Sequence, residues 1–235
     1  MSVVLLDVRP RAAYDAGHLP GAVHVDPEQD LSAAGPDPAQ GGRHPLPGDA
    51  QLEAVFARAG VGEDSFVLAV DDGSGWGARC WWLLRHVGHD HAGTLDLGAY
   101  VGPFETEAVV PPTAAFRVRP RTDDTITGEE ILARLGDPSL LLLDARSRPR
   151  WLGEEEPLDP VAGRIPGALN APFTEPLPGG AATASEIVTY CGSGVTACVL
   201  AQKLVLAGRT DVRLYPGSFS EWCRRASYPV QKGSA

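Results

Sequence analysis

The sequence lacks any apolar run of membrane-spanning length and any dense run of basic residues. A transmembrane helix needs about 20 consecutive, mostly apolar residues. Nucleic acids and anionic membranes are bound through clusters of Lys and Arg, and the net charge here is −10. We therefore expect neither nucleic acid nor a membrane as a partner.

Cysteine is also scarce. The four cysteines, at positions 80, 191, 198 and 223, show no spacing typical of metal ligands, so we expect no metal and no cofactor. The apolar start, residues 1–7, lacks the basic region and cleavage site of a signal peptide. Reduced thiols and a cytoplasmic location fit this cysteine usage best. The length of 235 residues fits one large or two small domains.

One of the four cysteines lies in a distinctive setting. Residues 187–190 form a short apolar run rich in β-branched and aromatic residues, which predicts a buried strand. Residues 198–207, followed by Gly208, have the pattern of a helix and its stop signal. Cys191 therefore lies in the turn between a strand and a helix. Gly192 and Gly194 let the backbone curl around the sulfur, and the N–H groups of such a turn favour an anion. This pattern predicts a nucleophilic thiolate at Cys191; the other cysteines fit small buried side chains.

The two halves of the chain repeat the same landmarks. The matched pairs are Val4–Arg9 with Leu141–Arg146, Gly17–Ala22 with Gly163–Ala168, Asp72–Gly75 (or a start at Asp71) with Cys191–Gly194, and Thr94–Leu97 with Val212–Tyr215. Strands and helices alternate in both halves, as they do in parallel α/β folds. We predict an N-terminal domain over residues 1–105, a linker over 106–124 and a C-terminal domain over 125–235.

The stretch from Cys191 to Ala197 and the repeated Asp-x-Arg and Gly-x-[Leu/Ile]-Pro-Gly-Ala motifs resemble the two-domain rhodanese-type sulfurtransferases. The resemblance covers nearly the whole chain. It implies two tandem rhodanese-like domains, each a mainly parallel sheet flanked by helices. It also implies an active cysteine in the second domain that holds a sulfane sulfur as a persulfide. The first domain has an acidic residue at the matching position and is expected to be catalytically silent.

The resemblance also implies roles for single residues. Cys191 is the expected nucleophile, Ser193 a further catalytic residue, and Gly192, Gly194, Val195 and Thr196 complete the active-site loop. The hydroxyls of Ser193 and Thr196 have an alternative role as caps of the following helix.

Arg150 matches the substrate-binding arginine of the family, and a guanidinium suits an anionic sulfur donor. The alternative for Arg150 is a structural salt bridge to residues 154–156. From the first domain, the resemblance suggests His18 with Asp7 as assisting residues. The alternative is that His18 only stabilises its own turn.

The preferred sulfur donor is less clearly indicated. Thiosulfate-preferring rhodaneses carry basic residues directly after the cysteine, and this chain has Gly192 and Ser193 there. However, mercaptopyruvate enzymes carry a second arginine nine residues after the first, and this chain has Asp159 at that place. We predict transfer of sulfur from 3-mercaptopyruvate to a thiol or cyanide acceptor. The alternatives are a thiosulfate:cyanide sulfurtransferase and a non-catalytic rhodanese-like relay or binding module.

Two other enzyme classes are disfavoured. A cysteine-dependent phosphatase of a related fold needs an arginine at the end of its loop, and Ala197 stands there. A Cys/His protease is disfavoured because the second half of the chain contains no histidine.

Overall fold

The computed structural model describes residues 2–35, 37–179, 181 and 184–234. The chain forms two compact units. Unit 1 holds residues 1–33 and 46–121, and unit 2 holds residues 34–45 and 122–235. The division differs from the predicted domains in two respects. Residues 34–45, from the first half of the sequence, belong to unit 2, and residues 106–121, assigned to a linker, belong to unit 1.

Unit 1 is a parallel four-stranded sheet with strand order β2-β1-β3-β4. Its elements are β1 (Val3–Asp7), α1 (Arg11–Ala16), β2 (Val23–His24), α2 (Asp49–Arg58), β3 (Phe66–Asp71), α3 (Trp76–His86), β4 (Ala92–Asp96) and the 3₁₀ turn η1 (Leu97–Ala99).

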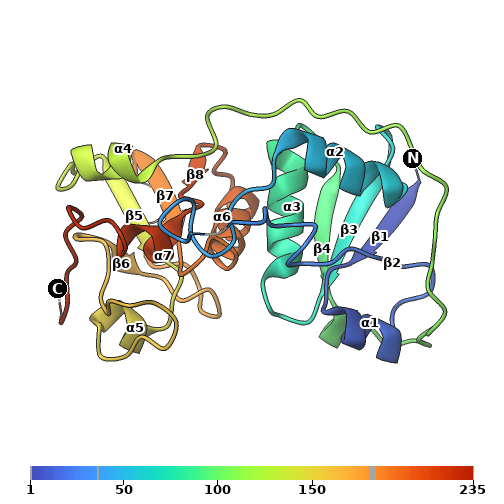
Figure 1. The fold of residues 1–235 in the computed structure, drawn as a ribbon, viewed down its shortest axis with the longest axis horizontal. Helices are drawn as coiled ribbons and strands as arrows, with labels where there is room; N and C mark the ends of the chain where they lie inside the picture. Colours follow the sequence, from blue (N-terminus) through green and yellow to red (C-terminus); the bar gives the residue numbers. More distant parts are fainter. Residues whose placement is uncertain (1, 36, 180, 182–183, 235) are drawn as a thin grey trace. The chain divides into compact units, whose positions relative to one another are not determined.

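Unit 2 repeats this sheet with strand order β6-β5-β7-β8, again parallel throughout. Its elements are α4 (Gly128–Ala133), β5 (Leu140–Asp144), α5 (Arg148–Leu152), β6 (Leu169–Asn170), β7 (Glu186–Tyr190), α6 (Ala197–Leu206), β8 (Val212–Leu214) and α7 (Ser218–Trp222). The predicted fold class is confirmed. Figure 1 shows α1 at the end of the unit 1 sheet where β1 stops, and α5 at the matching end of the unit 2 sheet.

The central strands are apolar because parallel sheets are covered on both faces. In unit 2 the core contains Leu142, Val188, Tyr190 and the fully buried Trp222. Helix α2 buries Leu52, Val55 and Phe56, as its spacing predicts. Gly48 is its N-cap and Asp49 its first helical residue, so the Asp49 side chain does not cap the helix.

The strand registers align the two units residue by residue. Asp7 of β1 pairs with Val70, and Asp144 of β5 pairs with Tyr190. Cys191, which follows Tyr190, is therefore equivalent to Asp71, which follows Val70. The sequence comparison left Asp71 and Asp72 both open, and the register selects Asp71.

The repeated Asp-x-Arg motif has the same structure in both units. The Arg9 Nη2 group donates to Asp7 at 2.6 Å and to the Gly17 carbonyl at 2.7 Å. In unit 2, Arg146 Nη2 donates to Asp144 at 2.6 Å and to the Gly163 carbonyl at 2.7 Å. Each buried pair thus fastens the carboxyl end of a strand to the turn that follows the next helix.

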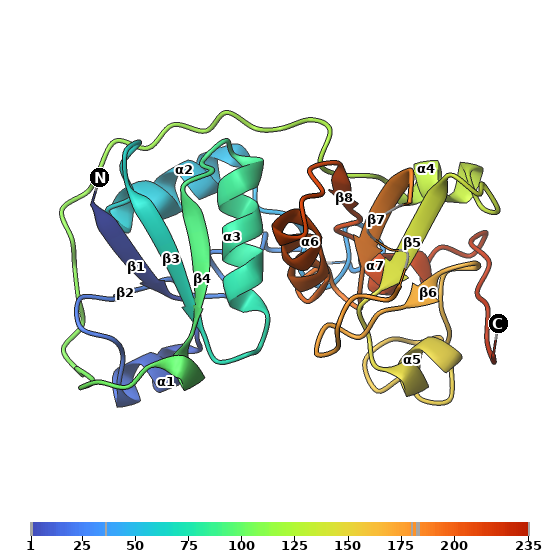
Figure 2. The same ribbon diagram turned by 180° about the vertical axis from the view of Figure 1, so that it is seen from behind.

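The units differ between their second and third strands. Unit 1 has helix α2 there, whereas no α-helix is described between β6 and β7; Figure 2 shows the two arrangements from behind. The segment 168–191 is short and rich in Pro and Gly, residues that disfavour a helix there. None of the helices in the described part of the chain has the length and apolar composition needed to cross a lipid bilayer.

Candidate active site

The loop after β7 is wrapped around the sulfur of Cys191. The Cys191 side chain is buried, with 2% of the residue exposed. The backbone N–H of Gly194 donates to Sγ at 3.1 Å. Gly194 has φ +83°, a conformation that L side chains rarely adopt, and a Cβ there would also collide with the carbonyl of Pro216. The loop therefore needs this glycine to direct an N–H group at the sulfur.

The start of the loop is anchored to the first turn of α7. The N–H of Cys191 donates to Ser218 Oγ at 3.1 Å, and its carbonyl accepts from the N–H of Phe219 at 2.9 Å. The Gly192 carbonyl accepts from the N–H of Ser220 at 2.9 Å. These bonds fix the backbone on either side of the sulfur.

Ser193 is buried and faces a histidine. His44 Nδ1 lies 2.8 Å from Ser193 Oγ, the distance of a hydrogen bond between the ring and the hydroxyl. The capping role considered for this serine is not seen, because Thr196 is the N-cap residue of α6. The Thr196 side chain itself makes no capping hydrogen bond, and Val195 is buried beside it.

His44 belongs to the segment 34–45, which comes from the first half of the sequence but is part of unit 2. Figure 1 draws this segment in blue beside α7. Gly42 has φ +81°, and a Cβ there would collide with the carbonyl of Gly217. Arg43 Nη1 donates to Asp159 Oδ2 at 2.6 Å. The segment thus lies close against Gly217 and is fastened to Asp159 through Arg43.

Arg150 lies near Gly192 of the loop. A Cβ placed on Gly192 would be 3.3 Å from Arg150 Nη2 and 3.5 Å from Nη1. Arg150 also forms the alternative salt bridge, since Nη2 donates to Glu156 Oε1 at 2.6 Å. The two roles are compatible, because a guanidinium has five N–H donors and one edge can serve each partner.

His18 and Asp7 are held within unit 1. The His18 ring stacks on Tyr14 with centroids 3.8 Å apart, and Nδ1 lies 3.0 Å from the Tyr14 carbonyl. Asp7 is paired with Arg9. Arg164, the equivalent of His18 in unit 2, likewise lies over the ring of Trp151. The structure thus gives His18 and Asp7 contacts of the kind expected for holding their own turn.

Sequence reasoning missed Arg43, His44 and the acceptor role of Asp159. No local pattern reveals them, since residues 30–48 have the composition of a loop and meet the cysteine only after folding. Glu156 was foreseen only as part of the acidic run that pairs with Arg150.

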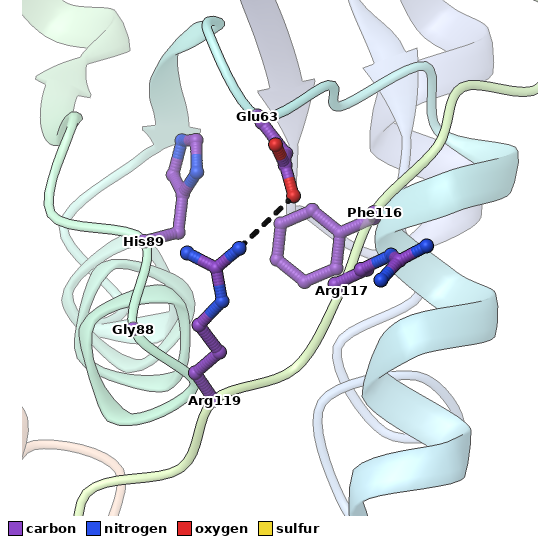
Figure 3. Close-up of a pocket in the computed structure, with 6 residues that line it drawn as sticks. All are labelled: Glu63, Gly88, His89, Phe116, Arg117 and Arg119. Atoms are coloured by element: carbon purple, nitrogen blue, oxygen red, sulfur yellow. Dashed lines mark hydrogen bonds and ion pairs between the residues drawn. The ribbon is translucent and has the colours of Figure 1, made fainter.

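A separate small pocket lies in unit 1 (Figure 3). Glu63 and Arg119 form an ion pair of 3.3 Å at its mouth. Burial lowers the pKa of His89, and its Nε2 atom has no hydrogen-bond partner among the described residues. The remaining lining residues are Gly88, Phe116 and Arg117. The pocket contains no thiol and none of the predicted site residues, so the chemistry predicted for this chain does not belong there.

Comparisons with known proteins show the family of the chain. The rhodanese-like domain family matches residues 1–100 and again 127–225. The chain is 40% identical to the probable 3-mercaptopyruvate sulfurtransferase of Pseudomonas aeruginosa, over 94% of this chain and 86% of that protein. It is 38% identical to the putative thiosulfate sulfurtransferase SseB of Mycobacterium tuberculosis, over 99% of this chain and 92% of that protein.

Among solved structures, SseA from Escherichia coli, described as having the rhodanese fold of 3-mercaptopyruvate sulfotransferases, is 28% identical. The two structures superpose with a TM-score of 0.78, over 93% of each chain. Both halves match the same domain family. The two sulfurtransferases from Pseudomonas aeruginosa and Mycobacterium tuberculosis align with this chain across both halves. The chain therefore belongs to the family of two-domain rhodanese-type sulfurtransferases.

Proposed function

We propose that the protein moves a sulfane sulfur from 3-mercaptopyruvate to a thiophilic acceptor through a persulfide on Cys191. The observation that carries this proposal is the setting of Cys191. Its sulfur accepts an N–H from a glycine turn, and a hydroxyl and a guanidinium lie at the adjoining residues of the loop. The guanidinium suits the negative charge of an anionic donor, and the hydroxyl suits a donor oxygen that gains charge during the reaction.

The first step makes the persulfide. The Cys191 thiolate attacks the thiol sulfur of the donor, a new S–S bond forms and the donor's C–S bond breaks. The electron pair of that bond moves onto the donor's carbonyl oxygen, which leaves the enolate of pyruvate. Protonation of the enolate completes the step, and no external oxidant or reductant is needed. The N–H groups of the loop stabilise the negative charge on the terminal sulfur.

Ser193 and His44 act on the donor's ketone. The Ser193 hydroxyl donates a hydrogen bond to the oxygen that becomes the enolate, and His44 supplies the proton through Ser193. Their 2.8 Å contact supports this relay, because a positioned acid or base must lie within hydrogen-bond distance of the proton that it moves. We assign this assisting role to His44 rather than to His18 and Asp7.

The second step returns Cys191 to its starting state. An acceptor nucleophile attacks the terminal sulfur, the S–S bond breaks, and its electron pair stays on Cys191 as the thiolate. A thiol acceptor becomes a persulfide, and cyanide becomes thiocyanate. Arg150 holds the donor's carboxylate during the first step through the guanidinium edge that faces Gly192.

Thiosulfate is the second candidate donor. The observation that favours it is the 38% identity to a protein described as a putative thiosulfate sulfurtransferase. Sulfite would be the leaving group, and it needs no protonated ketone. In that reaction Ser193 and His44 would have no oxygen to protonate.

A side-by-side assay tests the proposal. Purified protein is given 3-mercaptopyruvate or thiosulfate with cyanide as acceptor, and Cys191→Ser serves as control. We expect a higher kcat/KM for 3-mercaptopyruvate and no turnover in the variant. A clear preference for thiosulfate would replace the first candidate by the second. Turnover retained by Cys191→Ser would overturn both.

A further inference from the structure

A second guanidinium lies beside Arg150 at the residue after the cysteine. A Cβ placed on Gly192 would be 2.9 Å from Arg43 Nη2, closer than any atom of Arg150. In the described part of the chain, Arg43 Nη2 and Arg150 Nη1 make no hydrogen bond. Two guanidinium groups from different segments of the chain thus lie beside the Cβ position of Gly192.

A buried carboxylate sets the orientation of Arg43. The Asp159 side chain is fully buried, and its Oδ2 atom accepts from Arg43 Nη1 at 2.6 Å. Because a guanidinium is planar and rigid, a bond to one nitrogen fixes the direction of the others. Asp159 therefore holds Arg43 from behind and turns Nη2 toward the loop. Glu156 holds Arg150 in the same way.

The charges around these two arginines do not cancel. Described ion pairs connect four arginines, Arg43, Arg146, Arg150 and Arg224, to only three carboxylates, Asp144, Glu156 and Asp159. The network therefore has one surplus positive charge. A donor oxyanion at Gly192 would be stabilised chiefly by Arg43 and Arg150, whose nitrogens face this point, because a charge-assisted hydrogen bond acts only at contact distance.

We propose that Arg43 is a donor-binding residue, which grips the oxyanion head of the sulfur donor together with Arg150, and that Asp159 is its positioning residue. The inference rests on the proposed function, in which that head is the carboxylate of 3-mercaptopyruvate. The donor is clamped between residues separated by more than a hundred positions in the sequence. Its reactive sulfur is thereby placed over Cys191, one residue away.

The chain offers a matched control. Arg224 Nη1 donates to the other oxygen of Asp159 at 2.7 Å, so Arg224 has the same charge and the same partner as Arg43. No atom of Arg224 is among the three atoms nearest to the Cβ position of Gly192. Replacing either arginine changes the charge of the network equally, but only Arg43→Met removes a nitrogen that faces the donor.

The test measures KM and kcat for 3-mercaptopyruvate and for thiosulfate in wild type, Arg43→Met, Arg43→Lys and Arg224→Met. We expect Arg43→Met to raise the KM for 3-mercaptopyruvate at least about tenfold, with kcat within about threefold, because a charge-assisted hydrogen bond to the bound donor is lost. The KM of Arg43→Lys should lie between those of wild type and Arg43→Met. The KM of Arg224→Met should stay within about twofold of wild type.

Binding of pyruvate gives a readout that needs no turnover. In NMR titrations, pyruvate should shift the loop amides of wild type and Arg224→Met with similar Kd values, and Arg43→Met should raise that Kd at least about fivefold. An unchanged Kd in Arg43→Met would overturn the inference, as would an equal loss in Arg224→Met. A wild type that binds pyruvate through Arg43 but turns over only thiosulfate would contradict the proposed donor and leave the assignment of Arg43 standing.

Discussion

The two units have the same strand–turn–helix loop but a different side chain at its centre. In unit 1, the Asp71 carboxylate fills the turn between β3 and α3. It accepts the N–H groups of Ser74 at 2.8 Å, Gly75 at 2.9 Å and Gly77 at 2.7 Å. In unit 2, the sulfur of Cys191 takes that place and accepts the N–H of Gly194 at 3.1 Å.

The comparison teaches what the strand–turn–helix does by itself. In both units it directs backbone N–H groups at the residue where the strand ends, three such groups at Asp71 and that of Gly194 at Cys191. This arrangement favours an anion at that position. Unit 1 supplies that anion permanently, which makes its loop a structural element. Unit 2 supplies a nucleophile instead and adds Arg43, His44 and Arg150 around it. We therefore propose that activity depends on the added side chains as well as on the turn.

The largest loss of activity is expected when Cys191 of unit 2 is replaced by aspartate, the residue at the equivalent position 71 of unit 1. Cys191→Asp should lower sulfurtransferase turnover at least about a thousandfold, because the nucleophile is gone, while the new carboxylate accepts the N–H of Gly194. Turnover and thermal unfolding are measured on the same preparation. Cys223→Ser is the control and should remain active, since burial raises the pKa of Cys223 and keeps that thiol protonated. Turnover in Cys191→Asp would show that the persulfide forms elsewhere.

The second prediction separates the histidines of the two units. His44→Gln should lower kcat with 3-mercaptopyruvate about a hundredfold, the lower range for loss of a positioned acid or base. With thiosulfate its kcat should change less than about threefold, because sulfite leaves without a proton. His18→Gln, which alters a ring stacked on Tyr14, should change neither kcat. If His18→Gln slowed 3-mercaptopyruvate turnover as much as His44→Gln, the assisting role would return to the first unit.

A smaller effect is expected from loosening the segment that carries these side chains. In Gly42→Ala, the new Cβ meets the Gly217 carbonyl and φ +81° becomes strained. Arg43 and His44 are then displaced together but not removed, so kcat/KM should fall about tenfold. Circular dichroism should be unchanged. Gly48→Ala is the matched control, because nothing lies within 4 Å of its Cβ position; equal losses in both variants would argue against the anchoring role of Gly42.

The features that the sequence predicts are those formed by residues close together in the chain. The strand, turn and helix around Cys191 were predictable, because each follows from residues within one short window. A salt bridge from Arg150 to the nearby run 154–156 was considered as the alternative to donor binding, and Glu156 is the partner within that run. Residues 34–45 carry loop composition alone, and their contact with Asp159 or Ser193 depends on how the whole chain folds. By contrast, helix α4 was missed although Thr127 and Glu130 form a capping box, a local signal that the sequence displays.

The last prediction tests whether the unit 1 loop is structural. Asp71→Ala removes the acceptor of three N–H groups in a buried turn, so the free energy of unfolding should fall by about 2 kcal/mol. The kcat/KM of the folded protein should stay unchanged, because none of the proposed donor contacts involves Asp71. Asp72→Ala carries the same change of charge at an exposed neighbour and should leave stability within about 0.5 kcal/mol of wild type. A stable Asp71→Ala protein with lower turnover would mean instead that the carboxylate of the first unit takes part in sulfur transfer.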